Sequence, residues 1–403
     1  MNILLVSSYL PYPLFSGGHI RLYNLIKELS RKHKITLICE KRDYQGESEI
    51  LELKKYCKKV ITIPRKKQWS IRNILKTGLS TLPFLVIGHA SDEMQKKIQK
   101  EINENQFDLI HVETSYVMQN LPADLDIPVV LVEHNVEYMV YKRFVDRAPL
   151  FLKPLLSIDV RKLKRWEEAM WKKATKLVAV SEYEKKMMEK IRRDVVVVAN
   201  GVDIEQFTIS NLQFTKDKKE KRILFIGEFK WMQNRDAIGW IIKDIWPKLM
   251  AEFIPSMTEK GLKLWIVGRN IPSSIKKLTT GKNIIFDENA PKETEQIYQK
   301  ADLLLAPIRV GGGTSFKILE AMASGVPVLT TELGNALEAE VGKEIIVATD
   351  TDDFVVKIKE VLEDKGFYEK ISNNGRKLIE EKYNWKKISN DLESVYESVM
   401  PYA

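Results

Sequence analysis

The sequence contains little of what marks a disulfide-stabilised, zinc-binding or membrane-spanning chain. Its 403 residues include two cysteines, Cys39 and Cys57, which are too few for a disulfide framework or a zinc site. No apolar run approaches the roughly 18 residues that cross a bilayer. The N-terminal stretch MNILLVSSYLPYP has no basic region and no small-residue cleavage site, so we expect a first β-strand there rather than a signal peptide. These absences predict a cytoplasmic protein.

The length and the charge balance bound the architecture. A chain of 403 residues is too long for one ordinary core, and two domains are the expectation. A hydrophobic share of 44% with 30% charged residues is typical of a globular protein. The formal net charge of +9 could serve nucleic acid or an anionic membrane surface, or it could reflect only Lys-rich solvated helices. Because no nucleic-acid motif with interleaved aromatic residues is present, we predict no nucleic-acid partner.

Short apolar strands alternate with helical stretches in both halves of the chain, and a polar linker, residues 206–220, separates the halves. Such alternation predicts parallel sheets that are covered by helices on both faces. We therefore predict an α/β protein with two doubly wound, Rossmann-like domains, 1–205 and 221–384. The expected strands are Ile3–Val6, Ile35–Cys39, Val60–Ile63, Phe107–Glu113, Pro128–His134, Leu177–Val180, Asp194–Asn200, Arg222–Gly227, Leu262–Gly268, Ile284–Asp287, Leu303–Pro307, Val326–Thr331 and Glu344–Ala348.

A glycine-rich turn between an expected strand and an expected helix is the most informative stretch, residues 307–331. Three glycines follow the strand, and the helix carries Lys317 and Glu320 in its first half. Glycine permits positive φ and lets a ligand approach the backbone, and the first turn of a helix offers free N–H groups to a phosphate. The turn therefore predicts a diphosphate site. Its expected contacts are Gly312, Gly313, Thr314, Ser315 and Lys317.

Further short motifs run in one order through the whole chain. They are Gly17-Gly18, Val180–Glu182, Asn200–Asp203 with Phe207, Phe225–Gly227, Val267–Gly268 and Leu319–Pro327. This order resembles the retaining GT-B glycosyltransferases of family 4, whose two domains face a central cleft. The resemblance implies transfer of a sugar from a nucleotide-diphospho-sugar, UDP- or GDP-linked, to a glycan or lipid-linked acceptor, without a bound metal or other cofactor. It implies that the second domain holds the donor and the first the acceptor, and that a final helix, 385–403, packs back on the first domain.

The chain departs from the family pattern at three positions. Glu320 matches the second glutamate of the family's pair, which typically holds the ribose hydroxyls, but Gly312 stands where the first is usual. Glu228 and Gln233 replace an Arg and a Lys that usually bind the diphosphate. This stretch resembles a sub-branch in which an asparagine, here Asn234, leads the following helix, and Asn is a favoured N-cap. A catalytically inactive protein that binds a nucleotide-sugar or a partner enzyme therefore remains an alternative. A nucleotide-sugar epimerase is a third, which the second-domain resemblance disfavours.

Without a metal, fixed N–H dipoles and cations must stabilise the leaving nucleoside diphosphate. Lys317 is the first candidate cation, followed by Arg269 at the end of an expected strand and by Lys230; each could instead be a solvated side chain. Gly17 and Gly18 could bring their backbone to the diphosphate or the transferred sugar, or could form only a packed turn. The expected donor contacts are Gly17, Gly18, Gly227, Lys230, Asn234, Gly268, Arg269, Gly312, Gly313, Thr314, Ser315, Lys317 and Glu320, and the expected catalytic residues are His134, Lys317 and Arg269.

His134 matches the position at which family members commonly carry a histidine facing the reacting sugar. A hydrogen-bond acceptor there would stabilise an oxocarbenium-like centre. The alternative is a hydrogen-bonded structural histidine. His111, at the end of another expected strand, is a second candidate of this kind. Glu113 and Glu133 lie close by in the sequence, and either could partner the acceptor hydroxyl.

A basic stretch of the first domain, from Lys54 to Lys76, interleaves nine lysines and arginines with Trp69 and aliphatic residues. Such a mixture suits the surface of an anionic membrane, although a solvated outer face would have the same composition. A second basic patch follows at Arg161–Trp166. We predict weak, salt-sensitive binding to anionic lipid and a peripheral location on the inner face of the membrane.

Overall fold

The computed structural model describes residues 1–146, 148–207, 220–252, 261–278, 283–289, 293–310 and 314–400. Contacts divide the chain into two compact units. Unit 1 is Met1–Ala199 together with the described residues from Ile388 onward, and unit 2 is Asn200–Lys387. Most of the linker predicted at 206–220 lies outside the described residues.

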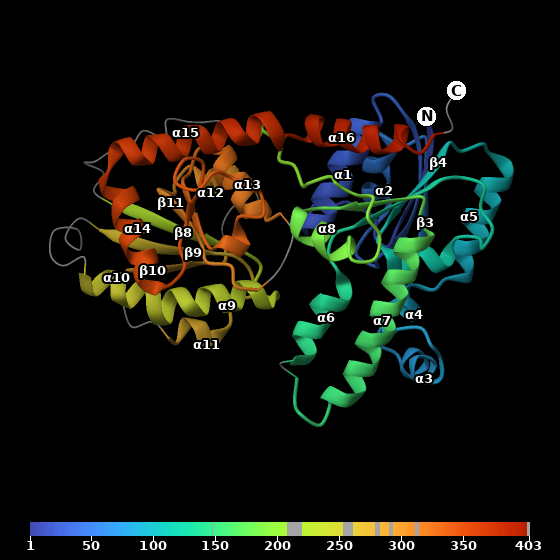
Figure 1. Ribbon diagram of the computed structural model, residues 1–403, viewed down its shortest axis with the longest axis horizontal. Helices are drawn as coiled ribbons and strands as arrows, with labels where there is room; N and C mark the ends of the chain where they lie inside the picture. The colour runs from blue at the N-terminus through green and yellow to red at the C-terminus, as the bar shows by residue number, and fades with distance from the viewer. Residues whose placement is uncertain are drawn as a thin grey trace. The chain divides into compact units, whose positions relative to one another are not determined.

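Unit 1 is built on a seven-stranded sheet in which all strands run parallel (Figure 1). Its strands are β1 (Asn2–Ser7), β2 (Lys34–Lys41), β3 (Lys59–Pro64), β4 (Leu109–Glu113), β5 (Val129–Glu133), β6 (Lys176–Ala179) and β7 (Val195–Val197). They lie in the order β3-β2-β1-β4-β5-β6-β7. Every residue of β4 and β5 is buried, as expected for central strands with helices on both faces.

The helices of unit 1 include one pair that extends away from the sheet. The helices are α1 (Gly17–Leu29), α2 (Glu47–Lys54), α3 (Ile71–Leu79), α4 (Phe84–His89), α5 (Asp92–Glu104), the 3-10 helix η1 (Ser115–Asn120), α6 (Glu137–Asp146), α7 (Lys153–Lys173) and α8 (Glu182–Met188). Figure 1 shows α6 and α7 as an antiparallel hairpin, with α3 and α4 beside α7. Two side-chain hydrogen bonds from Lys162 of α7, to the carbonyl oxygens of Thr77 (2.6 Å) and Ser80 (2.7 Å), hold the end of α3.

The last helix of the chain, α16 (Trp385–Glu397), carries the C-terminal residues into unit 1. Glu393 pairs with Lys32 at 2.7 Å and bonds the His33 ring at 3.1 Å. The helix follows α15 (Lys365–Lys382) and begins at residue 385, where the final helix is expected from the sequence. The buried residues of α16 in unit 1 lie at helical spacing and include Ile388, Leu392, Val395 and Tyr396.

Unit 2 is built on a second all-parallel sheet, of six strands. The strands are β8 (Lys221–Ile226), β9 (Leu262–Val267), β10 (Ile284–Asp287), β11 (Leu303–Ala306), β12 (Val328–Thr330) and β13 (Ile346–Val347), in the order β10-β9-β8-β11-β12-β13. The two sheets confirm the predicted α/β class with two doubly wound domains. β7 and β13 are shorter than the apolar runs at 194–200 and 344–348 suggested.

The helices of unit 2 bury apolar residues against its sheet. Between β8 and β9 run α9 (Met232–Trp240), a π-helical turn (Ile241–Ile245) and α10 (Trp246–Glu252). The remaining helices are α11 (Ser273–Lys276), α12 (Glu295–Tyr298), α13 (Phe316–Ala323), the 3-10 helix η3 (Glu332–Gly334), α14 (Thr351–Glu363) and α15. The apolar residues Ile238, Ile241, Ile242, Ile245 and Leu249 recur at helical spacing and are all buried in the core that includes this sheet.

Candidate functional site

The segments that follow β8 and β9 contact each other at the carboxyl edge of the unit 2 sheet, where ligands of such sheets bind. Two glycines make this contact possible. The N–H of Gly227 donates to the Val267 carbonyl, and the N–H of Gly268 donates to the Asp287 carbonyl, both at 3.0 Å. Gly268 has φ +152°, and a Cβ there would lie 1.9 Å from the Gly227 carbonyl oxygen. The structure thus gives both predicted glycines a packing role at this edge.

Lys317, in the first turn of α13, reaches back to the end of β8. Its Nζ donates to Asn234 Oδ1 at 2.8 Å and lies 4.7 Å from the centroid of the Phe225 ring. Burial lowers the pKa of Lys317 to about 7, although the carboxylate of Glu320 acts in the opposite direction. An anion bound at this helix start would favour the charged ammonium, because the buried lysine has little water around it.

Asn234 has a different role from the one predicted. The helix α9 begins at Met232 with Trp231 as its N-cap, so Asn234 is the third helical residue and not the cap. Its Nδ2 donates to the Glu228 carbonyl at 2.8 Å while its Oδ1 accepts from Lys317. The side chain therefore bonds both the loop after β8 and Lys317, and it fixes where the Lys317 ammonium lies.

Glu320 lies one helical turn beyond Lys317 and is held by a tyrosine that the sequence did not point to. The Tyr298 hydroxyl donates to Glu320 Oε2 at 3.0 Å. Burial raises the pKa of Glu320 to about 7, and hydrogen bonds from Tyr298 and Thr294 oppose this. The arrangement leaves a fixed carboxyl group close to the start of α13. No sequence pattern marks Tyr298, because it lies in the four-residue helix α12.

The turn before α13 is only partly described. Gly312 and Gly313 fall at positions 311–313, outside the described residues. Thr314 is buried, and its carbonyl accepts a hydrogen bond from Asn200 Nδ2 at 3.0 Å. Ser315 is the N-cap residue of α13. Asn200, the first residue of the motif Asn200–Asp203, therefore fixes the approach to the helix whose first-turn N–H groups have no intrahelical acceptors.

The two other predicted cations lie exposed on the loops after β8 and β9. Arg269 contributes its carbonyl to a bond from the Phe229 N–H at 3.0 Å, and the N–H of Lys230 donates to Glu228 Oε1 at 3.2 Å. Glu228 Oε1 also accepts from Asn270 Nδ2 at 2.7 Å. Glu228, which replaces the family's arginine, thus ties the two loops together.

In unit 1 the structure brings His134 and the predicted glycines together. Gly17 is the first residue of α1, after the N-cap Ser16, and Gly18 follows it. A Cβ on Gly18 would lie 3.0 Å from the Tyr9 hydroxyl and 3.4 Å from His134 Nδ1. The Tyr9 hydroxyl donates to the Gly18 carbonyl at 3.2 Å. A side chain at Gly18 would therefore crowd the Nδ1 edge of His134.

Glu113, at the end of β4, lies between two histidines. His134 Nε2 contacts Glu113 Oε2, and His111 Nε2 lies 2.9 Å from Glu113 Oε1. His111 Nδ1 lies 2.5 Å from the hydroxyl of Tyr396 on α16. Burial alone would raise the pKa of Glu113, but the facing His134 and His111 rings hold it well below its ordinary value. Glu113 is therefore a carboxylate in the interior of unit 1.

Glu133, at the end of β5, has different surroundings. Its carboxylate accepts from Trp171 Nε1 at 3.0 Å and from the Ser115 N–H at 3.3 Å. Burial raises its pKa to about 7, and burial together with Glu133 raises the pKa of Glu137 to about 7 as well. Glu113 and Glu133, the two candidates for contacting an acceptor hydroxyl, are both fully buried.

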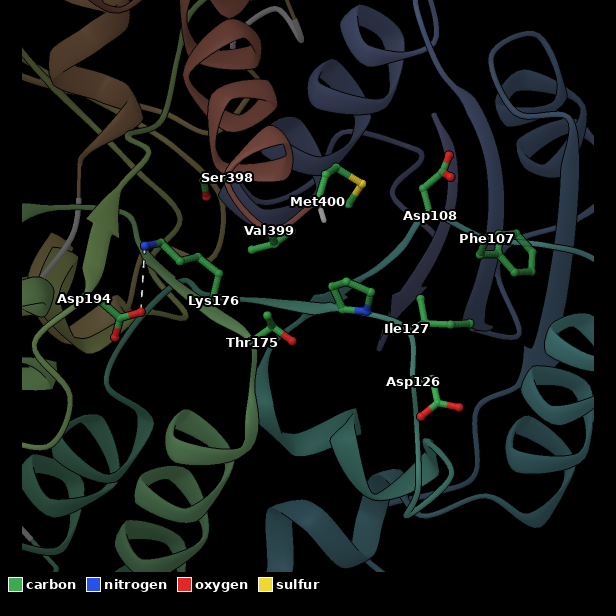
Figure 2. A pocket seen from close by; sticks show the side chains of 11 residues that line it. Phe107, Asp108, Asp126, Ile127, Thr175, Lys176, Asp194, Ser398, Val399 and Met400 are labelled. Carbon is green, nitrogen blue, oxygen red and sulfur yellow. Dashed lines mark ion pairs between the residues drawn. The ribbon is translucent and has the colours of Figure 1, made fainter. Parts of the chain in front are cut away.

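A hollow of about 950 Å³ lies at the opposite edge of the unit 1 sheet (Figure 2). Its lining residues precede or begin β4 to β7, and they include Asp108, Asp126 and Lys176, with Met400 from the C-terminal segment. Lys176 and Asp194 form an ion pair across part of it at 3.8 Å. Because His134 follows the carboxyl end of β5, this hollow is separate from the His134 cluster.

Comparisons with known proteins agree with the two-domain α/β fold. Residues 15–206 match the family described as Glycosyltransferase Family 4, and residues 220–364 match Glycosyl transferases group 1. The chain is 27% identical over 242 residues to the capsular polysaccharide biosynthesis glycosyltransferase CapM of Staphylococcus aureus, covering 56% of this chain and 62% of CapM. It is 24% identical over 426 residues to an uncharacterized glycosyltransferase of Methanocaldococcus jannaschii, covering 99% of both.

A solved structure shares the fold over the full length. HepE of Anabaena, in complex with UDP and glucose, superposes with a TM-score of 0.66 at 14% identity, covering 99% of this chain and 100% of HepE.

Proposed function

Because the chain is a glycosyltransferase of the GT-B architecture, with a family 4 domain and a group 1 domain, we propose that it moves a sugar from a nucleotide-diphospho-sugar to a glycan or lipid-linked acceptor in polysaccharide or glycolipid biosynthesis. The proposed donor is UDP- or GDP-linked. The transfer retains the anomeric configuration and uses neither a bound metal nor another cofactor. The observation that carries the proposal is Lys317, held by Asn234 at the start of α13 with Glu320 one turn away.

The proposed role of this cluster is to stabilise the departing nucleoside diphosphate. When the sugar–phosphate bond breaks, negative charge grows on the diphosphate, and fixed dipoles and cations close to it lower the barrier. The first-turn N–H groups of α13, beginning at Ser315, and the Lys317 ammonium supply both. Asn234 places the ammonium before the donor arrives, so little reorganisation accompanies the reaction. Arg269 and Lys230 are the proposed outer cations.

Glu320 is proposed to accept hydrogen bonds from the ribose hydroxyls. The bond from Tyr298 occupies one side of the carboxyl group and limits its rotation. Beyond the bonds from Tyr298 and Thr294, the carboxyl group has further acceptor positions for two adjacent hydroxyls. The carboxyl group accepts hydrogen bonds whether or not it is ionised, so a pKa near 7 is compatible with this role.

On unit 1, His134 is proposed to face the transferred sugar. Its Nε2 is engaged by Glu113, so Nδ1 is the atom available to a sugar hydroxyl or to the anomeric region. Gly18 leaves that edge uncrowded, and the backbone of Gly17 and Gly18 is the proposed second contact.

The test is release of the nucleotide from a panel of UDP-, GDP- and ADP-sugars, with and without acceptor glycans and lipid-linked sugars. We expect Lys317→Ala to lower kcat by about 10²-fold or more, because it removes a cation next to the leaving group. We expect Glu320→Ala to raise the donor KM by about 10-fold or more. The matched control is Lys343→Ala, an exposed lysine that pairs with Glu340 in the same unit. Tight nucleotide-sugar binding without any turnover would instead support an inactive binding protein.

We also propose that unit 1 docks on an anionic membrane surface, where a lipid-linked acceptor would be found. The structure describes no helix that is both long enough and apolar enough to cross a membrane. It does expose an amphipathic helix, α3, of which no residue is buried. Trp69, just before α3, is 79% exposed, and Leu79 at its end is 91% exposed.

The tip of the α6–α7 hairpin adds apolar residues that the sequence analysis did not single out. Leu150 and Phe151 are 82% and 81% exposed, and Leu155 and Phe144 are exposed beside them. Residues 66–79, which include α3, lie beside α7, and the hairpin tip lies at the start of α7 (Figure 1). Residues 66–79 and the tip are together called the basic–apolar face. Burying two such side chains in the interface would contribute about 3–6 kcal/mol.

The charge of the basic–apolar face favours anionic lipid over an uncharged partner. No Asp or Glu occurs between Glu52 and Asp92. Two of the predicted basic residues are engaged within unit 1 and contribute less to its surface charge. Arg65 pairs with Glu40, and Lys162 of the second patch donates to a carbonyl of α3. Within residues 66–79, the exposed cations for which the structure gives no ion pair are Lys66, Lys67, Arg72 and Lys76.

Sedimentation with vesicles tests this docking. Wild-type protein should sediment with phosphatidylglycerol vesicles at low ionic strength, less at high salt, and not with phosphatidylcholine alone. The double variant Leu150→Ser/Phe151→Ser should sediment less, while Val341→Ser/Val356→Ser, which changes two exposed valines of unit 2, should not differ from wild type. No sedimentation of wild type at low ionic strength would remove the proposal, as would concentration-dependent dimerisation abolished by the hairpin-tip variant.

A further inference from the structure

We propose that Tyr396, His111 and Glu113 form a hydrogen-bonded chain that positions His134, which makes the C-terminal helix α16 a working part of the sugar-facing site. The inference rests on the proposed role of His134 and names positioning residues for it. Nothing in the sequence motifs connects α16 to this site, and Tyr396 lies 285 residues from its partner His111.

The donors and acceptors of the chain are consistent from one end to the other. The Tyr396 hydroxyl donates to His111 Nδ1 at 2.5 Å. His111 then carries its proton on Nε2 and donates to Glu113 Oε1 at 2.9 Å. Glu113 Oε2 accepts in turn from His134 Nε2. Each histidine is held in the tautomer with the proton on Nε2, so His134 presents Nδ1 as an acceptor when its ring is neutral.

Burial increases from His134 inward along the chain. The side chain of His134 is 17% exposed, that of His111 is 1% exposed, and that of Glu113 is fully buried. Tyr396 is fully buried on α16. Buried hydrogen bonds of this kind have no competing water, so each one restricts the next group. Only the His134 end is accessible to a ligand bound to unit 1.

The surrounding charged groups keep the chain in one protonation pattern. Burial, together with Glu113, raises the pKa of Tyr396 well above its ordinary value, so its hydroxyl remains a donor. The other titratable groups facing the cluster are Arg21 from α1, Tyr9 from the loop after β1 and Glu133 from β5. Arg21 is itself fixed by the carbonyl oxygens of residues 198 and 199.

Geometry on β4 explains why the chain can form. His111 and Glu113 are two residues apart on one strand, so their side chains project from the same face of the sheet. α16 lies against that face, and its Tyr396 ring packs edge-on against the His111 ring at a centroid distance of 5.9 Å. A hydrophobic residue at either strand position would leave the other groups buried without partners.

The test compares Tyr396→Phe, which removes only the hydroxyl, with Tyr23→Phe as a matched control. The Tyr23 hydroxyl also contacts a carboxylate in unit 1, Glu52 at 2.8 Å, and it lies 3.5 Å from the Tyr56 hydroxyl; neither partner belongs to the hydrogen-bonded chain that ends at His134. We expect Tyr396→Phe to lower kcat about 2- to 10-fold with an unchanged donor KM, as for loss of one supporting hydrogen bond. We expect it to shift the ring ¹⁵N resonances of His134 at fixed pH. Tyr23→Phe should change neither quantity.

Glu113→Gln is the second variant, because it keeps the shape of the side chain but replaces one acceptor by a donor. One histidine must then change its tautomer or lose its bond, and we expect kcat to fall about 10²-fold. Thermal unfolding of each variant separates loss of positioning from loss of the fold.

The outcomes separate failure of this inference from failure of the proposed function. If wild type transfers sugar but Tyr396→Phe changes neither kcat nor the His134 resonances, the hydrogen-bonded chain has no positioning role and the inference is wrong. If the resonances shift while kcat stays constant, Tyr396 positions His134 but His134 has no part in transfer. The proposed contribution of α16 to the sugar-facing site is then wrong. If wild type transfers no sugar from any donor, the resonances alone decide whether Tyr396 positions His134.

Discussion

Replacing Lys317 by methionine should raise the stability of the protein and weaken nucleotide binding at the proposed diphosphate site. Methionine keeps the unbranched shape that packs against Phe225 but removes the buried ammonium. The pKa of Lys317 is lowered from 10.5 to about 7 in the folded protein. Between these two pKa values the unfolded chain binds a proton that the folded chain has lost, so the stability of wild type rises with pH across this window. Below pH 7 the buried ammonium destabilises the folded protein to the full extent.

The magnitude follows from this difference. At pH 8 the unfolded lysine must lose a proton some 2.5 pH units below its ordinary pKa, which costs about 3 kcal/mol. Lys317→Met removes that cost, and in a unit of this size the Tm should rise by about 6–12 °C. The gap between variant and wild type should widen toward pH 7 and close as the pH approaches 10.5. The lost bond to Asn234 subtracts a little from the gain.

Affinity for the nucleotide should change in the opposite direction. Titration calorimetry with UDP and with GDP should show affinity lowered about 10- to 100-fold in Lys317→Met, as for a hydrogen bond to a charged group. Between pH 7.5 and 9.5 wild type should lose affinity by up to about tenfold per pH unit, because the diphosphate must recruit a proton to Lys317. The variant should show no such slope.

The control and the refuting result are direct. Lys343→Met changes an exposed lysine of the same unit, and its Tm should stay within about 2 °C of wild type. A lower Tm for Lys317→Met at pH 8 would show that burial of the ammonium does not destabilise the fold. An unchanged affinity for both nucleotides would show that Lys317 does not contact the diphosphate.

Two further predictions concern backbone packing and buried carboxyl groups. Gly268→Ala should destabilise unit 2 by more than about 3 kcal/mol in chemical unfolding, because its φ is positive and the new Cβ would overlap the Gly227 carbonyl. The control Gly239→Ala, in helix α9 with no heavy atom near the new Cβ, should be neutral or slightly stabilising. Equal effects of the two substitutions would contradict the reasoning. Glu137 has a folded pKa of about 7 against an ordinary 4.5, so the folded state binds more protons and wild type loses stability as the pH rises through this window. The Tm of Glu137→Gln should therefore exceed that of wild type by an amount that grows from pH 4.5 to pH 7 and then stays constant. A constant difference across the whole range would show that burial and Glu133 do not raise the pKa of Glu137.

Local patterns predicted the fold well because parallel strands are marked by their own residues. Apolar runs such as Leu109–Val112 or Leu303–Ala306 are buried on both faces, and nothing distant is needed to recognise them. The position of Lys317 beside a helix start could be inferred in the same way, since the glycine turn and the helix are contiguous in the sequence.

The partners of the site residues could not be predicted, because they come from distant parts of the chain. Tyr298 reaches Glu320 from another helix, and Asn234 reaches Lys317 across 83 positions. Composition also overestimated the exposed positive charge, since Arg65 is neutralised inside unit 1 by Glu40, a residue of a different strand. Pairings of this kind are set by tertiary packing, which no local pattern encodes.

The return of α16 to unit 1 has a consequence for the order in which the protein is made. A ribosome completes residues 1–199 long before it reaches residue 388, and domains generally fold as they emerge. Until Tyr396 leaves the exit tunnel, His111 has no hydroxyl partner and the apolar face that receives α16 has no cover. The first unit to begin folding is thus the last to be completed, and the nascent chain carries an unfinished surface throughout synthesis of unit 2.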